Sequence, residues 1–472
     1  MTWNPLYISD RRTRRGRDRR VDLHERMRFN IRQAWFKEFV AVIDDAMPVQ
    51  RTGRPRTHSV AAGAFIYLLS MSMSSQAEAE EYLRYGTNWN GYRRLLVAEF
   101  PDEALLSHGA PPPTKSLIRH IKHHLGQCEA EKIESILQAA ALIHAKEMGI
   151  GINRGTLLNP SLEAGMYGDG VVIRPMTKYR KGDMGFNERQ GCLQERRHDP
   201  DAAYHYDGMN RRVYGNVFAH MSAWTGVPSE HVTFGIRPIR KGGGITEAQI
   251  ALGFADAIKK ELPGMAMLHW DKALRGKTVE EIWDMEMMPM IGVYDKTGRT
   301  TEQVSLGKKK IDGIETAIFA CRGAVSIKAI DGSFIPLRAS KLVYQHNAKS
   351  TCRVYCDYIV PEGSNCDVRL WNGKITQRIN SPEKADFTFG EHIRAHAPGS
   401  ADWKNLYGNR SLAESLNSVL KNDLGRGERA RSLNLNHQWI DLMVMLLMRN
   451  DQSLVLYRRR TQLARAASPP AA

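Results

Sequence analysis

The stretch that most constrains this chain is residues 407–421, which read YGNRSLAESLNSVLK. A helix turns by about 100° per residue, so one face of a helix here carries a phenol, a guanidinium, a carboxylate and an ammonium. These groups belong to Tyr407, Arg410, Glu414 and Lys421. The opposite face is apolar and must pack on a core; its residues are Leu412, Leu416, Val419 and Leu420. A carboxylate can hold a metal ion and the cations can hold phosphate oxygens, so the polar face suits a phosphodiester.

The spacing Tyr-x2-Arg-x3-Glu-x6-Lys resembles the signature of one large group of DDE transposases from bacterial insertion sequences. Four fixed residues at fixed offsets rarely match by chance in a chain of this length. In that family the glutamate is the third metal-binding acid of an RNase H-like catalytic core, and the first two acids are aspartates on upstream strands. The alternative is an amphipathic surface helix with a solvated charged face.

The composition limits the class of protein. A chain of 472 residues has room for two or three domains. Its net charge of +16 implies a polyanionic partner, most simply nucleic acid, although a basic but ordinary enzyme has the same charge. The six cysteines are scattered, which favours a reduced, intracellular setting. We expect no secretory signal, because the N-terminus is polar and rich in arginine and has no apolar segment. We expect no membrane partner, because the apolar run at residues 442–448 is too short to span a bilayer.

The N-terminal segment is strongly basic, and residues 11–20 read RRTRRGRDRR. Such a run cannot pack in a core, so we expect residues 1–27 to form a disordered arm that neutralises phosphates or only aids solubility. Further on, Gly53-Arg54-Pro55 resembles the core of an AT-hook, which lies in the minor groove of DNA. Arg54 is the candidate DNA contact in that interpretation, and a plain linker is the alternative.

Helical periodicity dominates the rest of the first third. Apolar residues recur at steps of three and four, which predicts helices near residues 29–47, 59–73, 76–85, 115–125 and 129–148. The second and third of these fit a helix-turn-helix element or ordinary bundle packing. We expect residues 28–150 to form a helical domain that recognises DNA ends. His120, His123 and His124 have spacings that could hold a metal ion, but they lack an evident Cys or carboxylate partner, and we interpret them as surface residues.

The candidate for the first acid lies in the segment that follows the glycine-rich joint at residues 149–160. Residues 164–173 read AGMYGDGVVI and predict a buried strand with Asp169 in its middle. A carboxylate inside an apolar strand is costly unless a cation meets it, so Asp169 is the candidate. The alternatives are a turn aspartate between two glycines and a rival acid, Asp207, in the polar residues 176–211, which we expect to form a loop.

The second acid follows a predicted strand–helix–strand unit. Two further strands are predicted downstream of Asp169, at residues 212–224 and 231–239. A helix capped by Thr246 then leads to a short buried strand at residues 265–270. Asp271 stands at the carboxyl end of this strand, where α/β proteins usually bind ligands, and is the candidate for the second acid. Lys272 and Arg275 come next and suit phosphate contacts.

The long segment before Glu414 is rich in strand-like runs and turn signals at residues 300–395. The transposase group also has a β-rich insertion before the glutamate helix, where it contacts DNA. Tyr355 or Trp371 could stack on a base or pack in a sheet. Four cysteines here lack the close Cys-x2-Cys spacing of zinc sites, so core thiols are the simpler interpretation; they are Cys321, Cys352, Cys356 and Cys366.

These expectations describe an α/β protein with an RNase H-like mixed sheet flanked by helices, a β-rich insertion before the glutamate helix and an all-helical N-terminal domain. The expected order is an arm at residues 1–27, the helical domain at 28–150, the first part of the core at 160–299, the insertion at 300–395, closing helices at 396–460 and a tail at 461–472.

The resemblance implies a DNA transposase in which Asp169, Asp271 and Glu414 hold two Mg²⁺ ions, for which Mn²⁺ can substitute. Such an enzyme cuts transposon ends and joins the freed 3′-OH to target DNA. In this family Arg410 and Lys421 would fix the strand backbone.

The resemblance also implies the partners and the setting of the protein. Double-stranded DNA would be bound at its terminal inverted repeats and as target, with Tyr407 near the scissile phosphate. A homodimer would form the synaptic complex, in the bacterial cytoplasm with the nucleoid. The alternatives are an RNase H-like nuclease or recombinase without transposition, and a host-adopted DNA-binding protein without catalysis.

Overall fold

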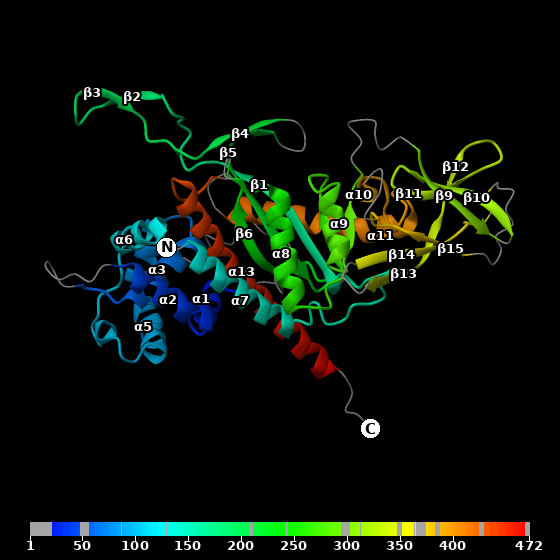
Figure 1. Cartoon of the computed structure of the whole chain (residues 1–472). Helices are drawn as coiled ribbons and strands as arrows, with labels where there is room; N and C mark the ends of the chain where they lie inside the picture. The colour runs from blue at the N-terminus through cyan, green and yellow to red at the C-terminus, as the bar shows by residue number, and fades with distance from the viewer. Residues whose placement is uncertain are drawn as a thin grey trace.

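The computed structural model describes residues 21–47, 56–85, 87–128, 130–206, 211–240, 244–293, 303–311, 313–346, 352–362, 364, 374–382, 388–423 and 429–467. Outside these residues lie most of the predicted basic arm, the motif Gly53-Arg54-Pro55, and the candidate residues Asp207, Cys366 and Trp371. The described chain is a mixed α/β protein with a helical part at one end, a central sheet, and smaller sheets at the other end (Figure 1).

The first part of the structure is helical. Its helices are α1 (Leu23–Ile31), α2 (Ala34–Ala46), α3 (Val60–Ser72), α4 (Gln76–Arg84), α5 (Asn88–Glu99), α6 (Lys115–Cys128) and α7 (Ala130–Glu147). Ser59 caps α3, because its Oγ accepts a hydrogen bond from the Ala62 amide at 2.9 Å. Residues 60–71 are all buried, so α3 lies at the centre of these helices. The five predicted helices are confirmed, except that residues 29–47 are divided between α1 and α2.

α1 begins inside the segment predicted to be a disordered arm. Asp22 caps this helix by accepting a hydrogen bond from the Glu25 amide at 2.8 Å. Val21 and Met27 are buried. The prediction that the arm extends to residue 27 is therefore wrong, since these apolar residues give the segment a packing face that the preceding run of arginines lacks.

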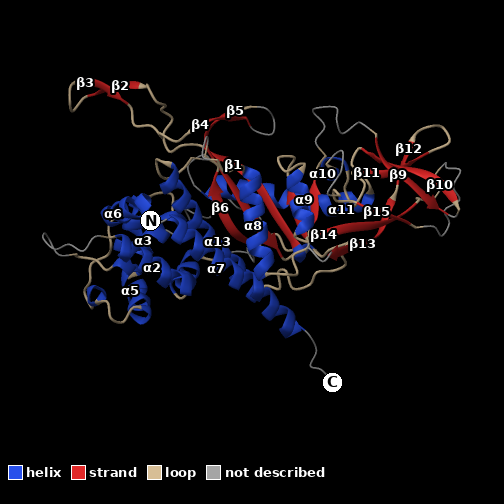
Figure 2. Ribbon diagram, in the orientation of Figure 1, coloured by secondary structure: helices blue, strands red, loops and turns tan. Residues whose placement is uncertain are grey.

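A mixed sheet forms the centre of the molecule (Figure 2). Its strand order is β4-β5-β1-β7-β8, and β6 also pairs with β5. The strands are β1 (Gly165–Ile173), β4 (Ala203–Tyr206), β5 (Arg212–Trp224), β6 (His231–Pro238), β7 (Met267–Trp270) and β8 (Met288–Ile291). β1 is antiparallel to β5 and parallel to β7, and β7 is parallel to β8. The four strands predicted before Asp271 are confirmed to within two residues at their ends.

Helices pack on both faces of this sheet. α8 (Glu247–Glu261) and α9 (Lys277–Asp284) share one apolar core with the sheet. On the other face, α12 (Ser411–Asp423) and α13 (Leu435–Ala467) share a second core with the N-terminal helices and with Ile173 and Phe218 of the sheet. The helical segment predicted as a separate domain thus packs together with the C-terminal helices, and residue 150 does not divide two cores.

The C-terminal helix α13 is longer than the sequence indicated, with 33 residues. Three arginines expected to be frayed lie inside it and form ion pairs with acids of α7, α1 and the β5–β6 connection; the pairs are Arg458–Glu147, Arg459–Glu25 and Arg460–Glu230. The predicted tail from residue 461 is therefore helical as far as Ala467. Among the described helices, none is by itself both long and apolar enough to cross a membrane.

The segment predicted to be a loop, residues 176–211, contains strands in the structure. β2 (Met184–Asn187) and β3 (Cys192–Glu195) form a hairpin, and β4 extends the central sheet, within the segment predicted to be a loop. The segment predicted to be rich in strands, residues 300–395, does contain them, in two small sheets, β12-β11-β10-β9 and β13-β14-β15. Their strands are β9 (Val304–Ile311), β10 (Ile314–Cys321), β11 (Ala324–Lys328), β12 (Phe334–Pro336), β13 (Arg338–His346), β14 (Cys352–Ile359) and β15 (Ile375–Arg378).

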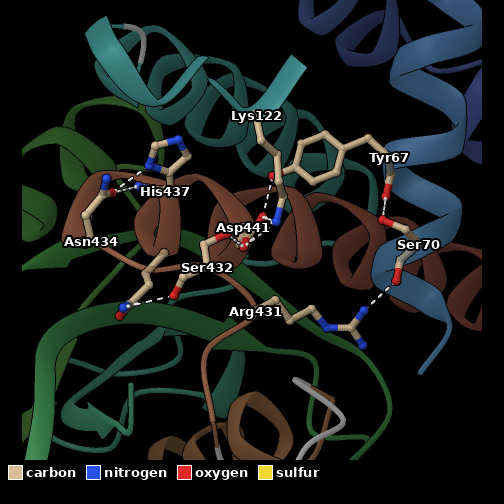
Figure 3. Close-up of polar contacts among 9 residues, drawn as sticks. Tyr67, Ser70, Lys122, Arg431, Ser432, Asn434, His437 and Asp441 are labelled. Carbon is tan, nitrogen blue, oxygen red and sulfur yellow. Dashed lines mark hydrogen bonds and ion pairs between the residues drawn. The ribbon is translucent and has the colours of Figure 1, made fainter. Parts of the chain in front are cut away.

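A buried ion pair ties α13 to the N-terminal helices α3 and α6 (Figure 3). Lys122 Nζ lies 2.7 Å from Asp441 Oδ1, and the Asp441 side chain is only 1% exposed. Tyr67 donates a hydrogen bond to Asp441 Oδ1 at 2.5 Å, and Ser432 donates one to Oδ2 at 2.6 Å. The carboxylate thus joins three elements that lie far apart in the sequence.

Asp441→Ala is expected to lower the free energy of unfolding by roughly 3–5 kcal/mol, because it leaves the Lys122 ammonium buried without its partner. The double variant Lys122→Met/Asp441→Leu removes both charges and is expected to recover most of that loss. Urea unfolding followed by circular dichroism measures both effects. A double variant as unstable as Asp441→Ala would show that lost packing, and not the unpaired charge, causes the destabilisation.

Candidate catalytic site

The first two predicted acids belong to adjacent strands, with Asp169 inside β1 and Asp271 directly after β7. Tyr167 of β1 is the register partner of His269 of β7, and their rings stack with centroids 4.5 Å apart, so both side chains point to the same face. Asp169 follows two residues after Tyr167 and therefore faces the same side of β1. Asp271 follows two residues after His269, just beyond the end of β7, and is close enough for its charge to act on the Asp169 carboxylate.

The glycines on either side of Asp169 make room for neighbouring side chains. A Cβ on Gly168 would lie 1.8 Å from the Trp270 ring, and a Cβ on Gly170 would lie 3.2 Å from Glu247 Oε1. Both glycines belong to β1, where Asp169 pairs with a residue of β5. The alternative of a turn aspartate is therefore wrong, because these glycines permit close packing inside a strand.

Glu414 approaches Asp169 from α12. The predicted single helix is in fact three helical pieces: Tyr407 ends α11 (Ala401–Tyr407), a 3₁₀ turn covers Gly408–Arg410, and Glu414 lies in the first turn of α12. The Arg410 guanidinium lies between two acids, with Nη1 3.1 Å from Glu414 Oε1 and Nη2 3.9 Å from Asp169 Oδ1. The structure thus brings the first and third predicted acids to one cation.

α12 also contacts Asp169 through Asn417, which sequence reasoning missed. Asn417 Nδ2 donates a hydrogen bond to Asp169 Oδ2 at 2.8 Å, and Asn417 Oδ1 lies 2.7 Å from His220 Nε2. Burial lowers the pKa of His220 to about 4, so a neutral ring donates from Nε2 to the amide oxygen. This chain of hydrogen bonds from β5 to α12 to β1 fixes the direction of the Asp169 carboxylate.

The buried face of α12 differs in part from the predicted apolar stripe. Ala413, Leu416 and Leu420 are buried, whereas Leu412 and Val419 are only partly buried. The helix is therefore rotated relative to the prediction, and this rotation lets Asn417 reach the sheet.

Glu247 is a fourth carboxylate at this place. It is the first residue of α8, and its Oε1 accepts a hydrogen bond from Trp270 Nε1 at 3.0 Å. Burial raises the pKa of Glu247 to about 7, and the negative charges of Asp271 and Asp169 act in the same direction. In the sequence, Glu247 is only an acid next to the predicted cap Thr246. Nothing in the sequence indicates that this end of the helix lies beside β1.

The electrostatics of Asp169 reflect the same crowding. Burial raises the pKa of Asp169 to about 6; the Arg410 guanidinium opposes this rise, and the carboxylates of Asp271 and Glu414 add to it. The carboxylates of Asp169, Asp271 and Glu414 lie close together in a partly buried site, and the Arg410 guanidinium compensates only part of their negative charge. Such a site favours the binding of a further cation.

The carboxylates of Asp169, Asp271 and Glu414 fit a hard divalent cation, because Mg²⁺ prefers carboxylate oxygens as ligands. The three carboxylates come from separate elements. In the described part of the chain, no three His, Cys, Asp or Glu side chains lie close enough together to hold a metal ion as they stand. The Glu414 side chain is 58% exposed and bonded to Arg410, so it must turn away from Arg410 to share an ion with Asp169.

Two of the predicted phosphate-binding residues lie close together. A Cβ on Gly292, just after β8, would lie 3.3 Å from both Tyr407 Oη and Lys272 Cε. Tyr407 stacks on Trp403 with ring centroids 5.0 Å apart, which fixes the direction of its phenol. The exposed Lys272 follows Asp271 directly, so this pair lies beside the second acid.

The remaining predicted contacts are more scattered. Lys421 lies on α12, two turns and about 10 Å beyond Glu414, and is partly exposed. Arg275 is exposed just before α9. Arg54 lies outside the described residues.

The described cysteines of the insertion belong to its sheets. Cys352 and Cys356 are buried in β14, and burial raises the pKa of their thiols to about 11 and about 12. Their thiols therefore stay neutral at physiological pH, as expected of residues that pack in a core.

No known protein-family model matches this chain, and no curated protein is significantly similar to it. The function is therefore inferred from the residues and geometry of the site. Asp169, Asp271, Glu414 and Arg410 carry that inference, together with the overall basic charge.

Proposed function

We propose that this protein is a DDE-type DNA transposase that cuts transposon ends and joins the freed 3′-OH to target DNA by two-metal phosphoryl transfer. The observation that carries the proposal is the convergence of Asp169, Asp271 and Glu414 from three distant segments around the adjacent strands β1 and β7.

The arrangement of the strands supports an RNase H-like core. The strand of Asp169 is followed by antiparallel neighbours, β5 and β6, as in the transposase family. A helix and a parallel strand then lead to Asp271. The β-rich insertion lies between Asp271 and α12, where this transposase group also has one.

The protein's own residues have separable roles in this proposal. Asp169, Asp271 and Glu414 would hold the Mg²⁺ ions, and Asn417 would keep Asp169 in place. Bound Mg²⁺ supplies activation of the attacking water or 3′-OH and stabilises the leaving oxygen. Once Glu414 turns to the metal site, the Arg410 guanidinium is released to bind a phosphate.

Further cations would hold the DNA strand. Lys272 and Tyr407 lie beside Asp271, where they can contact the phosphates next to the scissile bond. Arg275 and Lys421 would add further contacts to the phosphates. Arg54 and the N-terminal arm, which lie outside the described residues, would add contacts to double-stranded DNA. A homodimer would hold two ends in one synaptic complex.

The test is strand cleavage of a DNA duplex that carries the gene's own flanking sequences, with Mg²⁺ or Mn²⁺ and with EDTA as the metal-free control. The expected products are metal-dependent nicks with 3′-OH ends at the borders of inverted repeats, and joining of those ends to a second DNA. Scattered metal-dependent cuts without joining would replace the proposal with a nuclease. Tight binding without any cut would favour a non-catalytic DNA-binding protein.

A further inference from the structure

A hairpin that the site does not use projects from the sheet. Residues 176–198, here called the hairpin arm, contain β2 and β3 and connect β1 to β4. Figure 1 shows β2 and β3 well away from the rest of the molecule, beyond β4 and β5. A hairpin of two strands is only marginally stable by itself, so its exposed side chains call for a partner.

One face of the hairpin arm is apolar and exposed. Phe186 of β2 pairs with Leu193 of β3, and Met184 lies on the same face two residues before Phe186. The exposed fraction is 64% for Phe186, 68% for Leu193 and 55% for Met184. Large apolar side chains gathered on one exposed face mark an interaction surface.

The charge of the hairpin arm identifies the class of partner. The hairpin arm contains six basic and three acidic residues. The basic residues are Lys178, Arg180, Lys181, Arg189, Arg196 and Arg197. With six basic and three acidic residues, the segment has a net charge of +3. The exposed charge is therefore positive and complements a polyanion.

The root of the hairpin arm is held by stacked rings and guanidinium groups. Arg180 lies over the rings of Tyr204 and Tyr214, at 5.1 Å and 5.5 Å from their centroids. Arg212 lies 3.6 Å from the centroid of Tyr204 on the neighbouring strand. Such contacts order the arm against the sheet without consuming the positive charge of the arginines.

The hairpin arm is also attached to the catalytic elements. β1 continues from Asp169 to Ile173, a rise of about 13 Å, and the arm begins directly after it. Arg429, which follows α12 in the chain, donates hydrogen bonds to the carbonyls of Pro175 and Thr177 at 3.1 Å and 3.2 Å. The arm is therefore anchored both to the strand of the first acid and to the segment after the helix of the third.

We propose that the hairpin arm is a DNA wedge, which inserts Phe186 and Leu193 between base pairs of the bound duplex while its basic side chains hold the flanking phosphates. Proteins that bend DNA insert Phe, Leu or Met side chains between base steps and surround them with Arg and Lys. Unstacked bases would make the strand easier to bend into the site. The inference rests on the proposed function only in taking duplex DNA as the substrate.

The experiment uses the full chain and a duplex of the gene's flanking sequence that carries 2-aminopurine at successive positions, without divalent metal. Binding of the wild-type protein is expected to raise 2-aminopurine fluorescence several-fold at one or two adjacent positions, because the base loses its stacking. Phe186→Ser/Leu193→Ser is expected to bind this DNA, measured by anisotropy, but to lose the rise.

Two matched variants control this experiment. Leu463→Ser removes an apolar side chain that is 71% exposed on α13, and it is expected to leave the fluorescence rise intact. Phe186→Leu/Leu193→Phe keeps the face apolar and is expected to retain the rise, which separates wedging from a general loss of hairpin structure.

Three results would overturn the wedge. The first is wild-type binding without any rise, and the second is a serine variant that keeps the full rise. The third is a serine variant that loses self-association in sedimentation while unstacking is unchanged, which would assign the face to a second copy. Unstacking without metal-dependent cleavage would refute only the transposase proposal, whereas cleavage at repeat ends without unstacking would refute only the wedge.

Discussion

Glu414→Gln is expected to lower the rate of metal-dependent DNA strand cleavage by about 10³-fold. The amide keeps the size of the side chain but removes the negative charge that would hold a divalent cation. Binding of DNA without metal is expected to be unchanged or tighter, because Arg410 loses its ionic partner at 3.1 Å and stays available for a phosphate. Gel analysis of cleaved strands and anisotropy titration of the same duplex measure the two effects.

The matched control for Glu414→Gln is Asp256→Asn on α8. Asp256 is also exposed, at 48%, and also forms an ion pair with a cation four residues away, Lys260. Because it lies outside the carboxylate cluster, its loss is expected to leave cleavage unchanged. Equal rates of cleavage by Glu414→Gln and wild type would show that Glu414 has no role in catalysis. Residues 407–421 would then be only an amphipathic surface helix.

The role of Arg410 explains why the free site has no preformed metal cage. Its guanidinium is bonded to Glu414 and close to Asp169, so it balances part of the charge that a cation would balance. In the proposed function, Asp169 and Glu414 would hold the metal ion, and Arg410 would then be available for a DNA phosphate. This exchange couples metal binding to substrate binding, and it predicts that DNA increases the affinity for Mg²⁺.

The sequence predicts the three acids because each stands in a local pattern. Asp169 interrupts an apolar strand, Asp271 ends another, and Glu414 lies at a fixed spacing from Arg410 and Lys421. The register that aligns Asp169 with Asp271 was not predictable, since strand pairing depends on contacts between distant segments.

Other features of the site depend on tertiary packing alone. Asn417 is an ordinary helix residue in the sequence, and only the rotation of α12 brings it to Asp169. Glu247 has the pattern of any acid in a first helical turn, where it is favourable next to the helix dipole. The hairpin arm was predicted to be a loop because its polar residues hide the short alternation of Met184 and Phe186.

The clustered acids also have a cost in stability, and Asp169 gives the clearest case. Its pKa rises from 3.8 to about 6 on folding, chiefly through burial. As pH rises, the unfolded chain therefore loses this proton first, and the folded state becomes less stable between about pH 4 and pH 6. A shift of about two pKa units corresponds to roughly 3 kcal/mol, which is fully lost above that range.

Asp169→Asn is therefore expected to raise the free energy of unfolding by up to about 3 kcal/mol at pH 8, while abolishing strand cleavage. Asparagine cannot ionise and can still accept the hydrogen bond from Asn417. The difference from wild type is expected to be near zero at pH 4, to grow to about pH 6 and then to stay constant. Urea unfolding at a series of pH values measures it.

Mg²⁺ should stabilise the two proteins in this series to different extents. It is expected to stabilise wild type at pH 8, because a ligand bound only to the folded state adds free energy of unfolding, and to stabilise Asp169→Asn much less. Asp256→Asn, an exposed change of the same chemistry, should follow wild type in both respects. Two results would contradict this prediction: a difference in the free energy of unfolding between Asp169→Asn and wild type that does not change with pH, or an Asp169→Asn protein less stable than wild type. Either would mean that Arg410 and Asn417 already compensate the buried charge of Asp169. The carboxylates would then not repel one another enough to favour a metal ion.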